Sequence, residues 1–91
     1  MKYKNEIAVN NLKRLRLGRG LRQQDVAMLI GIAYPDRISH WEKGTAVPSI
    51  INLFRLAKIY ETLPHKLYLT LSRKLSNEMK EIKSKLVSKV I

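Results

Sequence analysis

Residues 23–44 read QQDVAMLIGIAYPDRISHWEKG, and this stretch decides the fold. Apolar residues recur at helical spacing on both sides of Gly31, which suits the left-handed end of a helix. The first helix is expected at residues 23–30. The second is expected to begin at Pro35, because proline fits the first helical position, and to end before Gly44. Two short helices joined by a tight turn form a helix-turn-helix arrangement.

Helical patterns continue on both sides of this pair. N-terminal to it, one helix is expected from Asn5 to Gly18, with Asn5 as its N-cap. C-terminal to it, Ser49 is expected to cap a fourth helix, and a fifth begins at Pro64. The apolar stripes predicted for the first and fourth helices are Ala8, Leu12 and Leu15, and Ile50, Leu53, Phe54, Ala57 and Tyr60.

The last twenty residues keep the same periodicity, with a face of lysine and serine opposite an apolar stripe. That stripe consists of Leu75, Met79, Ile82, Leu86 and Val90. No stretch of the sequence alternates as a strand does. The predicted fold is therefore all-α: five helices over residues 1–71, including the helix-turn-helix pair, followed by a basic amphipathic helix over residues 72–91.

Composition limits the function. The chain has 91 residues and a net charge of +11, and the positive charge lies in its first 22 and last 26 residues, around a neutral centre. A small basic protein is expected to bind polyanions. The absence of cysteine excludes disulfides and thiolate metal sites, and no stretch approaches the ~20 apolar residues of a membrane span. No catalytic constellation is present, so neither an enzyme nor a cofactor is expected.

Several fixed points of residues 23–44 and their flanks resemble the Cro/repressor-like (Xre-type) helix-turn-helix family. The matching positions are Gln23, Ala27, Gly31, Ile38 and Trp41, supported by residues 15–23, 38–44 and 48–58. The resemblance covers roughly residues 7–70. It implies a five-helix repressor-like helix-turn-helix bundle and a cytoplasmic, sequence-specific double-stranded DNA-binding protein. Such a transcription regulator reads the major groove with its third helix, and the sequence leaves open whether it represses or activates.

The resemblance also implies which residues meet DNA. Ile38 and Trp41 are three apart and face inward, which leaves the opposite side of the third helix exposed. The expected base-reading residues are Tyr34, Pro35, Asp36, Arg37, Ser39 and His40. The expected phosphate contacts are Arg22, Gln23, Lys43 and Thr45.

This sequence departs from the family pattern in the turn before the third helix. One extra residue lies between Gly31 and Ile38, and Pro35 replaces a polar position. These departures leave the identity of the base readers open. The family also pairs an arginine of the first helix with the acid of the third, which implies a structural salt bridge between Arg16 and Glu42. His40 and His65 have no third ligand at metal spacing, so no metal site is expected.

A homodimer is expected, because one recognition helix reads only a few base pairs. The tail, together with the fifth helix, is its expected interface, although Met79, Ile82 and Leu86 make only a short heptad seam before Lys89. Three alternatives stay open. The chain could be an antitoxin-type autorepressor whose tail binds a toxin or other protein partner, a membrane-surface protein, or an interaction module that does not bind DNA.

Overall fold

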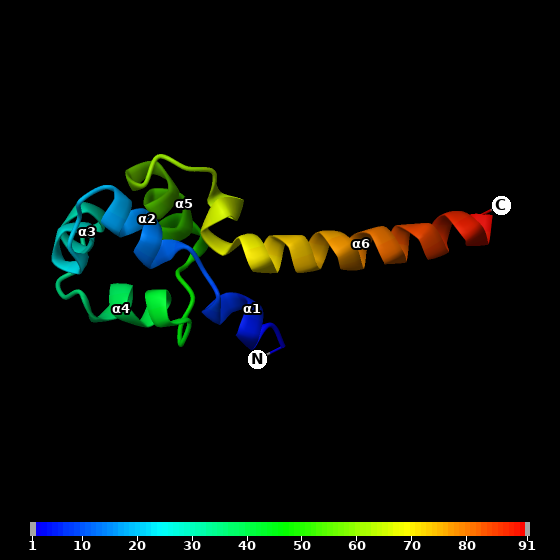
Figure 1. The fold of residues 1–91 in the computed structure, drawn as a ribbon, viewed down its shortest axis with the longest axis horizontal. Helices are drawn as coiled ribbons and strands as arrows, with labels where there is room; N and C mark the ends of the chain where they lie inside the picture. Colours follow the sequence, from blue (N-terminus) through cyan, green and yellow to red (C-terminus); the bar gives the residue numbers. More distant parts are fainter. Residues whose placement is uncertain (1, 91) are drawn as a thin grey trace.

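The computed structural model describes residues 2–90, with side chains over residues 2–87, and the regular secondary structure of this part of the chain is all helical (Figure 1). The all-α prediction is therefore confirmed. The elements are α1 (Lys4–Ala8), α2 (Leu12–Gly18), α3 (Gln23–Ile30), α4 (Asp36–Lys43), α5 (Ile50–Ile59), the 3-10 helix η1 (Pro64–Tyr68) and α6 (Leu69–Val90).

The predicted first helix is two helices, α1 and α2, so the prediction of one continuous helix is wrong. Asn10 causes the break, because its side chain competes with the helical hydrogen bonds. Its Nδ2 donates to the carbonyl of Ile7 at 2.9 Å, and its Oδ1 accepts the N–H of Leu12 at 3.1 Å. Asn5 is not the cap either, since α1 begins one residue before it.

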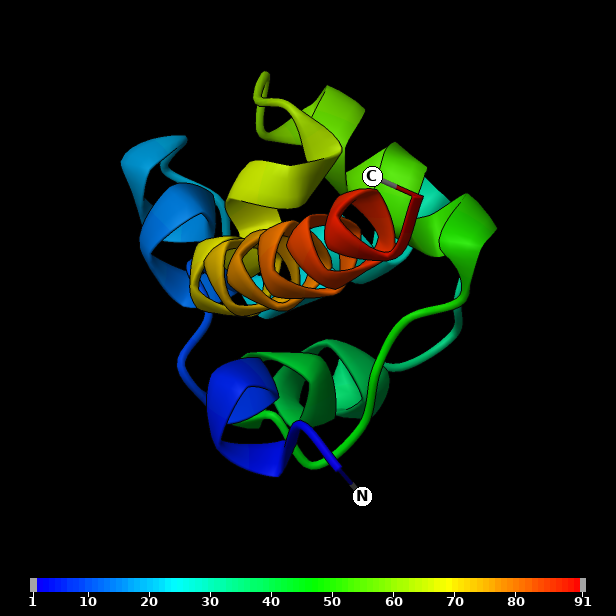
Figure 2. The same cartoon turned by 90° about the vertical axis from the view of Figure 1, so that its right-hand side faces the viewer.

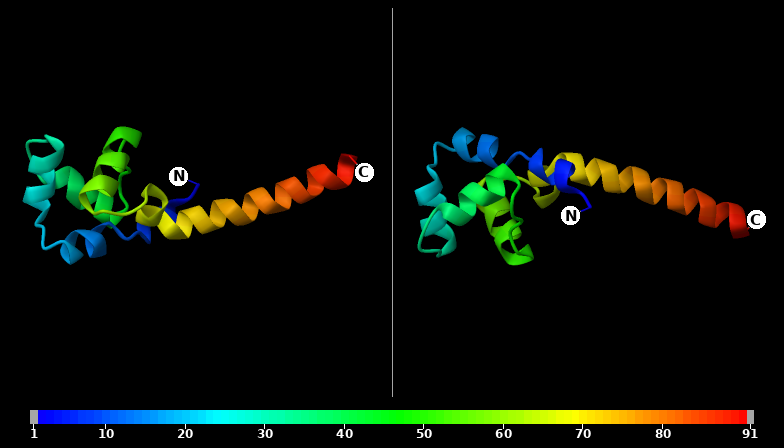
Figure 3. Two further views of the ribbon diagram at one scale, coloured as in Figure 1. Left: turned by 90° about the horizontal axis from the view of Figure 1, so that it is seen from above. Right: turned by 90° about the horizontal axis from the view of Figure 1, so that it is seen from below.

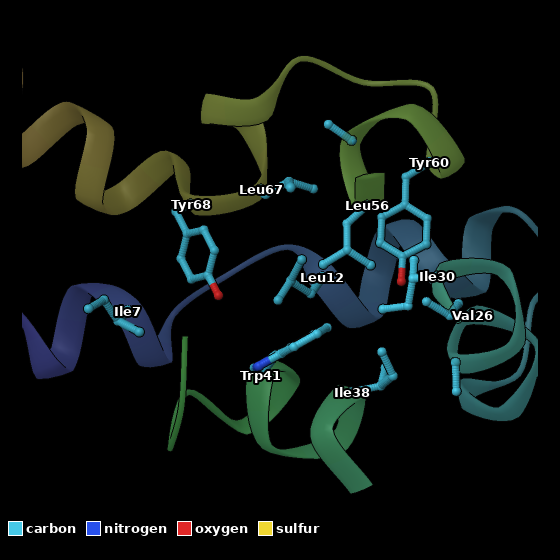
Figure 4. Close-up of a cluster of buried hydrophobic side chains, with 12 residues drawn as sticks. Ile7, Leu12, Val26, Ile30, Ile38, Trp41, Leu56, Tyr60, Leu67 and Tyr68 are labelled. Atoms are coloured by element: carbon cyan, nitrogen blue, oxygen red, sulfur yellow. The ribbon is translucent and has the colours of Figure 1, made fainter. Parts of the chain in front are cut away.

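The core lies between α3, α4, α5 and η1, and side chains from all four elements point into it (Figure 4). Ile38 and Trp41 of α4 enter it from one side, and Leu56 and Tyr60 enter from the other. The buried cluster consists of Ile7, Leu12, Val26, Ala27, Ile30, Ile38, Trp41, Leu56, Ala57, Tyr60, Leu67 and Tyr68.

The buried face of α5 matches the predicted one only in part, since Ala57 and Tyr60 are buried and Leu53 packs against the core as predicted. Ser49 caps α5 by accepting the N–H of Asn52 at 3.2 Å, as expected. However, Ile50 and Phe54 are exposed by 68% and 49%, whereas Leu56 is buried. The sequence of α5 is apolar on two faces, and its packing against α3 and η1 selects between them.

Helix α6 begins at Leu69, runs without a break through residues 71 and 72, and projects from the body (Figures 1 and 3). The Cα positions span 54 × 25 × 20 Å, so most of the length is this one helix. Near its start, α6 packs against α1, and the hydroxyl of Tyr3 donates to Glu78 at 2.8 Å. Beyond this contact the apolar stripe of α6 is exposed, from Leu75 at 37% to Leu86 at 61%. Val90, the last residue of the predicted stripe, lies outside the described side chains.

Replacing Tyr68 with phenylalanine is expected to leave the protein equally or more stable at neutral pH. The Tyr68 hydroxyl is buried without a hydrogen-bond partner among the described residues, and an unpaired buried hydroxyl costs about 1–3 kcal/mol. Burial also raises the pKa of Tyr68 from 10.0 to about 12. The wild type should therefore lose stability as the pH rises from about 10 towards 12, because only the unfolded chain releases this proton easily.

Chemical denaturation across the alkaline range measures both effects. The variant should lack the part of the alkaline loss that comes from Tyr68. Tyr34→Phe is the matched control, since Tyr34 is 73% exposed and should change neither quantity. A clear loss of stability in Tyr68→Phe at neutral pH would contradict an unpaired hydroxyl.

Candidate nucleic-acid interface

One face of α4 is largely exposed. Ile38 and Trp41 hold one face of α4 in the core, Glu42 is buried beside them, and the other polar side chains of α4 lie on the opposite face. Asp36, Arg37 and His40 are exposed or half-buried, and Ser39 lies on the same side of the helix. The outward face of α4 is therefore a short polar surface on a helix whose orientation is fixed by packing.

The turn between α3 and α4 determines where α4 begins. Gly31 adopts a left-handed φ of 78°, and the N–H of Ile32 donates to the carbonyl of Ala27 at 2.9 Å, which ends α3. Tyr34, on the rest of the turn, is 73% exposed. The helix begins at Asp36 rather than at Pro35, which takes the N-cap position instead. The carbonyl of Pro35 accepts the N–H of Ser39 at 3.0 Å.

Thr45, the residue after Gly44 at the end of α4, orients His40. The Thr45 hydroxyl donates to the His40 carbonyl at 3.2 Å, and the same oxygen lies 3.1 Å from His40 Nδ1. The donor in this contact is set by the tautomer of His40: when the Thr45 hydroxyl donates to the carbonyl, Nδ1 donates to the hydroxyl oxygen and a neutral ring has Nε2 as its acceptor. Thr45 thus positions His40, and its N–H is also bonded to the His40 carbonyl, at 3.0 Å.

Arg37 lies along the side of α4, with its guanidinium carbon 5.4 Å from the centre of the Trp41 ring. A guanidinium at this distance from an aromatic face is held by a cation–π contact of roughly 0.5–1 kcal/mol at an exposed site. The contact is weak enough to yield to a bidentate ligand. Arg37 therefore remains available to a partner in front of α4.

Hydrogen bonds between Arg22 and Asp25 cap the start of α3. The carboxylate of Asp25 accepts the N–H of Arg22 at 2.8 Å and its guanidinium at 2.9 Å, so the acid at the third position caps the helix. These bonds lower the pKa of Asp25. Asp25 was not among the predicted functional residues, although an acid three residues into a helix is the signal for this cap.

Gln23 points inward rather than towards the surface in front of α4. Its amide donates to Glu42 Oε1 at 3.0 Å. Arg16 donates to the same carboxylate from Nε at 2.6 Å and from Nη2 at 3.1 Å, and from Nη1 to the Leu21 carbonyl at 2.8 Å. The side chains of Arg16 and Glu42 are 8% and 5% exposed, and their bond raises the pKa of Arg16. The network ties α2, α3 and α4 together.

Asn10 also supports the C-terminal end of α4. Its amide lies 3.3 Å from the Trp41 carbonyl and 3.4 Å from the Glu42 carbonyl, both on the last turn of α4. Sequence reasoning did not select this residue. The pair of asparagines at positions 10 and 11 inside an apolar pattern was the available signal. Lys43, in the same turn of α4, is exposed.

The geometry defines a helix-turn-helix protein, with α3 as the supporting helix and α4 as the exposed one. A family model described as helix-turn-helix matches residues 12–67, which span α2 to η1. The chain belongs to this family of Cro/repressor-like, Xre-type DNA-binding regulators. No curated protein matches the sequence.

The described residues also bear on other kinds of site. They contain no group of three histidine or acidic side chains close enough to hold a metal ion. None of the helices described here has both the length and the apolar character needed to cross a membrane.

Proposed function

We propose that this protein is a sequence-specific double-stranded DNA-binding regulator that places α4 in the major groove. The observation that carries the proposal is the two-sided character of α4. Its apolar side is locked into the core by Ile38 and Trp41, and its polar side is uncovered. A helix held in this way can enter a groove about 12 Å wide without rearrangement of the body.

The base-reading roles follow from donor and acceptor chemistry on the outward face of α4. Arg37 can donate two hydrogen bonds to guanine, and Asp36 can accept from the amino group of cytosine. His40, with Nδ1 donating to Thr45, offers Nε2 as an acceptor for an adenine or cytosine amino group. Tyr34, Pro35 and Ser39 lie beside these residues and would shape the contact.

The phosphate contacts are proposed to flank the groove. Arg22 is 82% exposed in its side chain, and Lys43 lies at the far end of α4. Gln23 contributes through the N-terminal end of α3, because its own amide is engaged by Glu42. Thr45 contributes by orienting His40. The net charge of +11 supplies the long-range attraction to the polyanion.

Changing both Arg37 and His40 to alanine is expected to flatten sequence preference by about 10–100-fold while non-specific binding remains, because a bidentate base contact supplies about 1–3 kcal/mol of discrimination. Selection of bound duplexes from a random pool, followed by titration of the best site against a scrambled one, measures the change. The control is Lys58→Ala, which removes an exposed charge from α5. An unchanged preferred motif in the double variant would show that α4 is not the reader.

We also propose that the protein acts as a cytoplasmic homodimeric repressor. Two copies would double the number of base pairs read and multiply the affinity for an inverted repeat. The selected sequences bear on this directly, since a dimer should enrich two half-sites related by a twofold axis, whereas a monomer should enrich one.

A further inference from the structure

The apolar stripe of α6 continues into a groove on the body. Leu75, Met79, Ile82 and Leu86 follow the spacing of alternating a and d positions of a heptad, and all four are between 37% and 61% exposed. At the base of α6, a groove of about 400 Å³ is lined by Ile7, Val47, Leu53, Tyr68, Leu71 and Leu75. The stripe and the groove share Leu75, so they form one continuous apolar surface.

We infer that this surface is covered by α6 of a second copy, running antiparallel to the first. The inference rests on the homodimer of the proposed function and specifies how its two copies meet. The helix is amphipathic and largely uncovered, and an isolated helix of this length is marginal in water. Pairing with a second α6 removes the stripes of both copies from water at once.

The shape of the molecule selects the antiparallel orientation. Viewed along α6, the helix emerges from the middle of the body, with α1 and α4 on one side and α5 on the other (Figure 2). Paired helices lie about 8–10 Å apart. A parallel pair would therefore bring two bodies onto nearly the same axis, although the molecule is 20–25 Å wide across that axis. In an antiparallel pair the bodies lie at opposite ends and do not collide.

The apolar positions set the register. In an antiparallel coiled coil each a position faces a d position of the other helix. Leu75 then faces Leu86 of the second copy, and Met79 faces Ile82 of the second copy, which gives four apolar layers around a twofold axis between residues 80 and 81. The same register brings the end of the second α6 opposite residue 71, where the groove begins.

The charges beside the stripe agree with this register. Glu78 is one of only two acids on α6, and it lies beside Lys85 of the second copy, so the twofold axis creates two opposite-charge pairs. On the other side of the seam, Lys83 faces Ser76 of the second copy rather than another lysine. In the single chain, Lys85 reaches only Glu81 on its own helix, at 3.9 Å and in an exposed position. Charge complementarity therefore favours a second copy over an uncharged partner.

The pairing has a consequence for DNA. From the twofold axis to Leu69 is about 17 Å at a helical rise of about 1.5 Å per residue, so the two α6 helices begin roughly 35 Å apart. The bodies lie beyond those points, and each carries its own α4 (Figure 1). The two copies of α4 are then separated by more than one turn of DNA, which is about 34–36 Å. We expect half-sites whose centres are more than one turn of DNA apart.

Single cysteines test the pairing, since the natural chain contains none. Ser76→Cys and Lys83→Cys lie outside the apolar layers, so neither should disturb folding. Under mild oxidation without DNA, each variant alone should stay uncrosslinked, and their equimolar mixture should give a disulfide-linked dimer. The seam variant Leu75→Cys alone should not crosslink, whereas a parallel pair would bring its two introduced thiols together. Crosslinking of Leu75→Cys alone, or no crosslink in the mixture, would overturn the inference.

Charge reversal provides a second measurement by sedimentation. Lys85→Glu should weaken self-association at least several-fold, because Glu78 of the second copy then meets a like charge. Glu78→Lys combined with Lys85→Glu should restore self-association, and Tyr3→Phe controls for the bond to the Tyr3 hydroxyl that Glu78→Lys also removes. Lys80→Glu makes the same charge change on the outer face of α6 and is the matched control. Equal weakening by Lys80→Glu and Lys85→Glu would contradict the register. These measurements use no DNA, so their failure would leave base reading by α4 intact, and a failure of base reading would leave them intact.

Discussion

Replacing Glu42 with alanine is expected to lower the free energy of unfolding by about 3–5 kcal/mol, because it leaves the buried Arg16 guanidinium without its partner. The pair is bidentate and nearly inaccessible to water, with side-chain exposures of 8% and 5%. The same substitution also removes the acceptor for the Gln23 amide. Chemical denaturation with a two-state fit measures the change.

Two further variants show how much of this loss comes from the charge of Glu42 and how much depends on the burial of the pair. Glu42→Gln keeps an oxygen acceptor and the volume, so it should destabilise the protein less than Glu42→Ala, although it still leaves the arginine without a counter-ion. Glu81→Ala breaks the exposed pair with Lys85 and should cost no more than about 0.5 kcal/mol. If Glu42→Ala and Glu81→Ala cost the same, the first pair is not buried in solution.

Replacing Gly44 with alanine is expected to be nearly as damaging, at roughly 3 kcal/mol. Gly44 ends α4 with a φ of 78°, where a side chain is strained. In addition, a Cβ at this position would lie 2.4 Å from the Cα of Ala8. The obstacle is the backbone of α1, which cannot rotate away as a side chain could, so α1 must move from α4.

Gly31→Ala is the matched control for this prediction. Gly31 has the same φ of 78°, but no atom lies within 4 Å of the position that its Cβ would take. It should therefore show only the backbone strain of about 1–2 kcal/mol. The difference in unfolding free energy between the two variants measures the close approach of α1 to Gly44. Equal losses would mean that α1 does not pack there.

The central helices could be predicted from local signals alone. The bounds of α3, the N-cap at Ser49 and the inward positions of Ile38 and Trp41 follow from glycine punctuation, cap chemistry and helical periodicity. Each of these features depends on residues within one or two turns of one another. The helix-turn-helix and the outward face of α4 were therefore predictable from the sequence.

The supporting contacts depend on what lies across the chain, and only the tertiary structure decided them. Asn10 ends α1 through local hydrogen bonds, but only the fold brings carbonyls of α4 within reach of its amide. Gln23 turns away from the surface because Glu42 offers an acceptor.

The tertiary structure also decided the direction of α6 and the buried face of α5. Both helices carry apolar residues that a local pattern treats as core, yet Ile50 and the α6 stripe are exposed. Periodicity shows which residues of a helix share a face. Which face is buried depends on the elements that pack against it, and those contacts join residues far apart in the sequence.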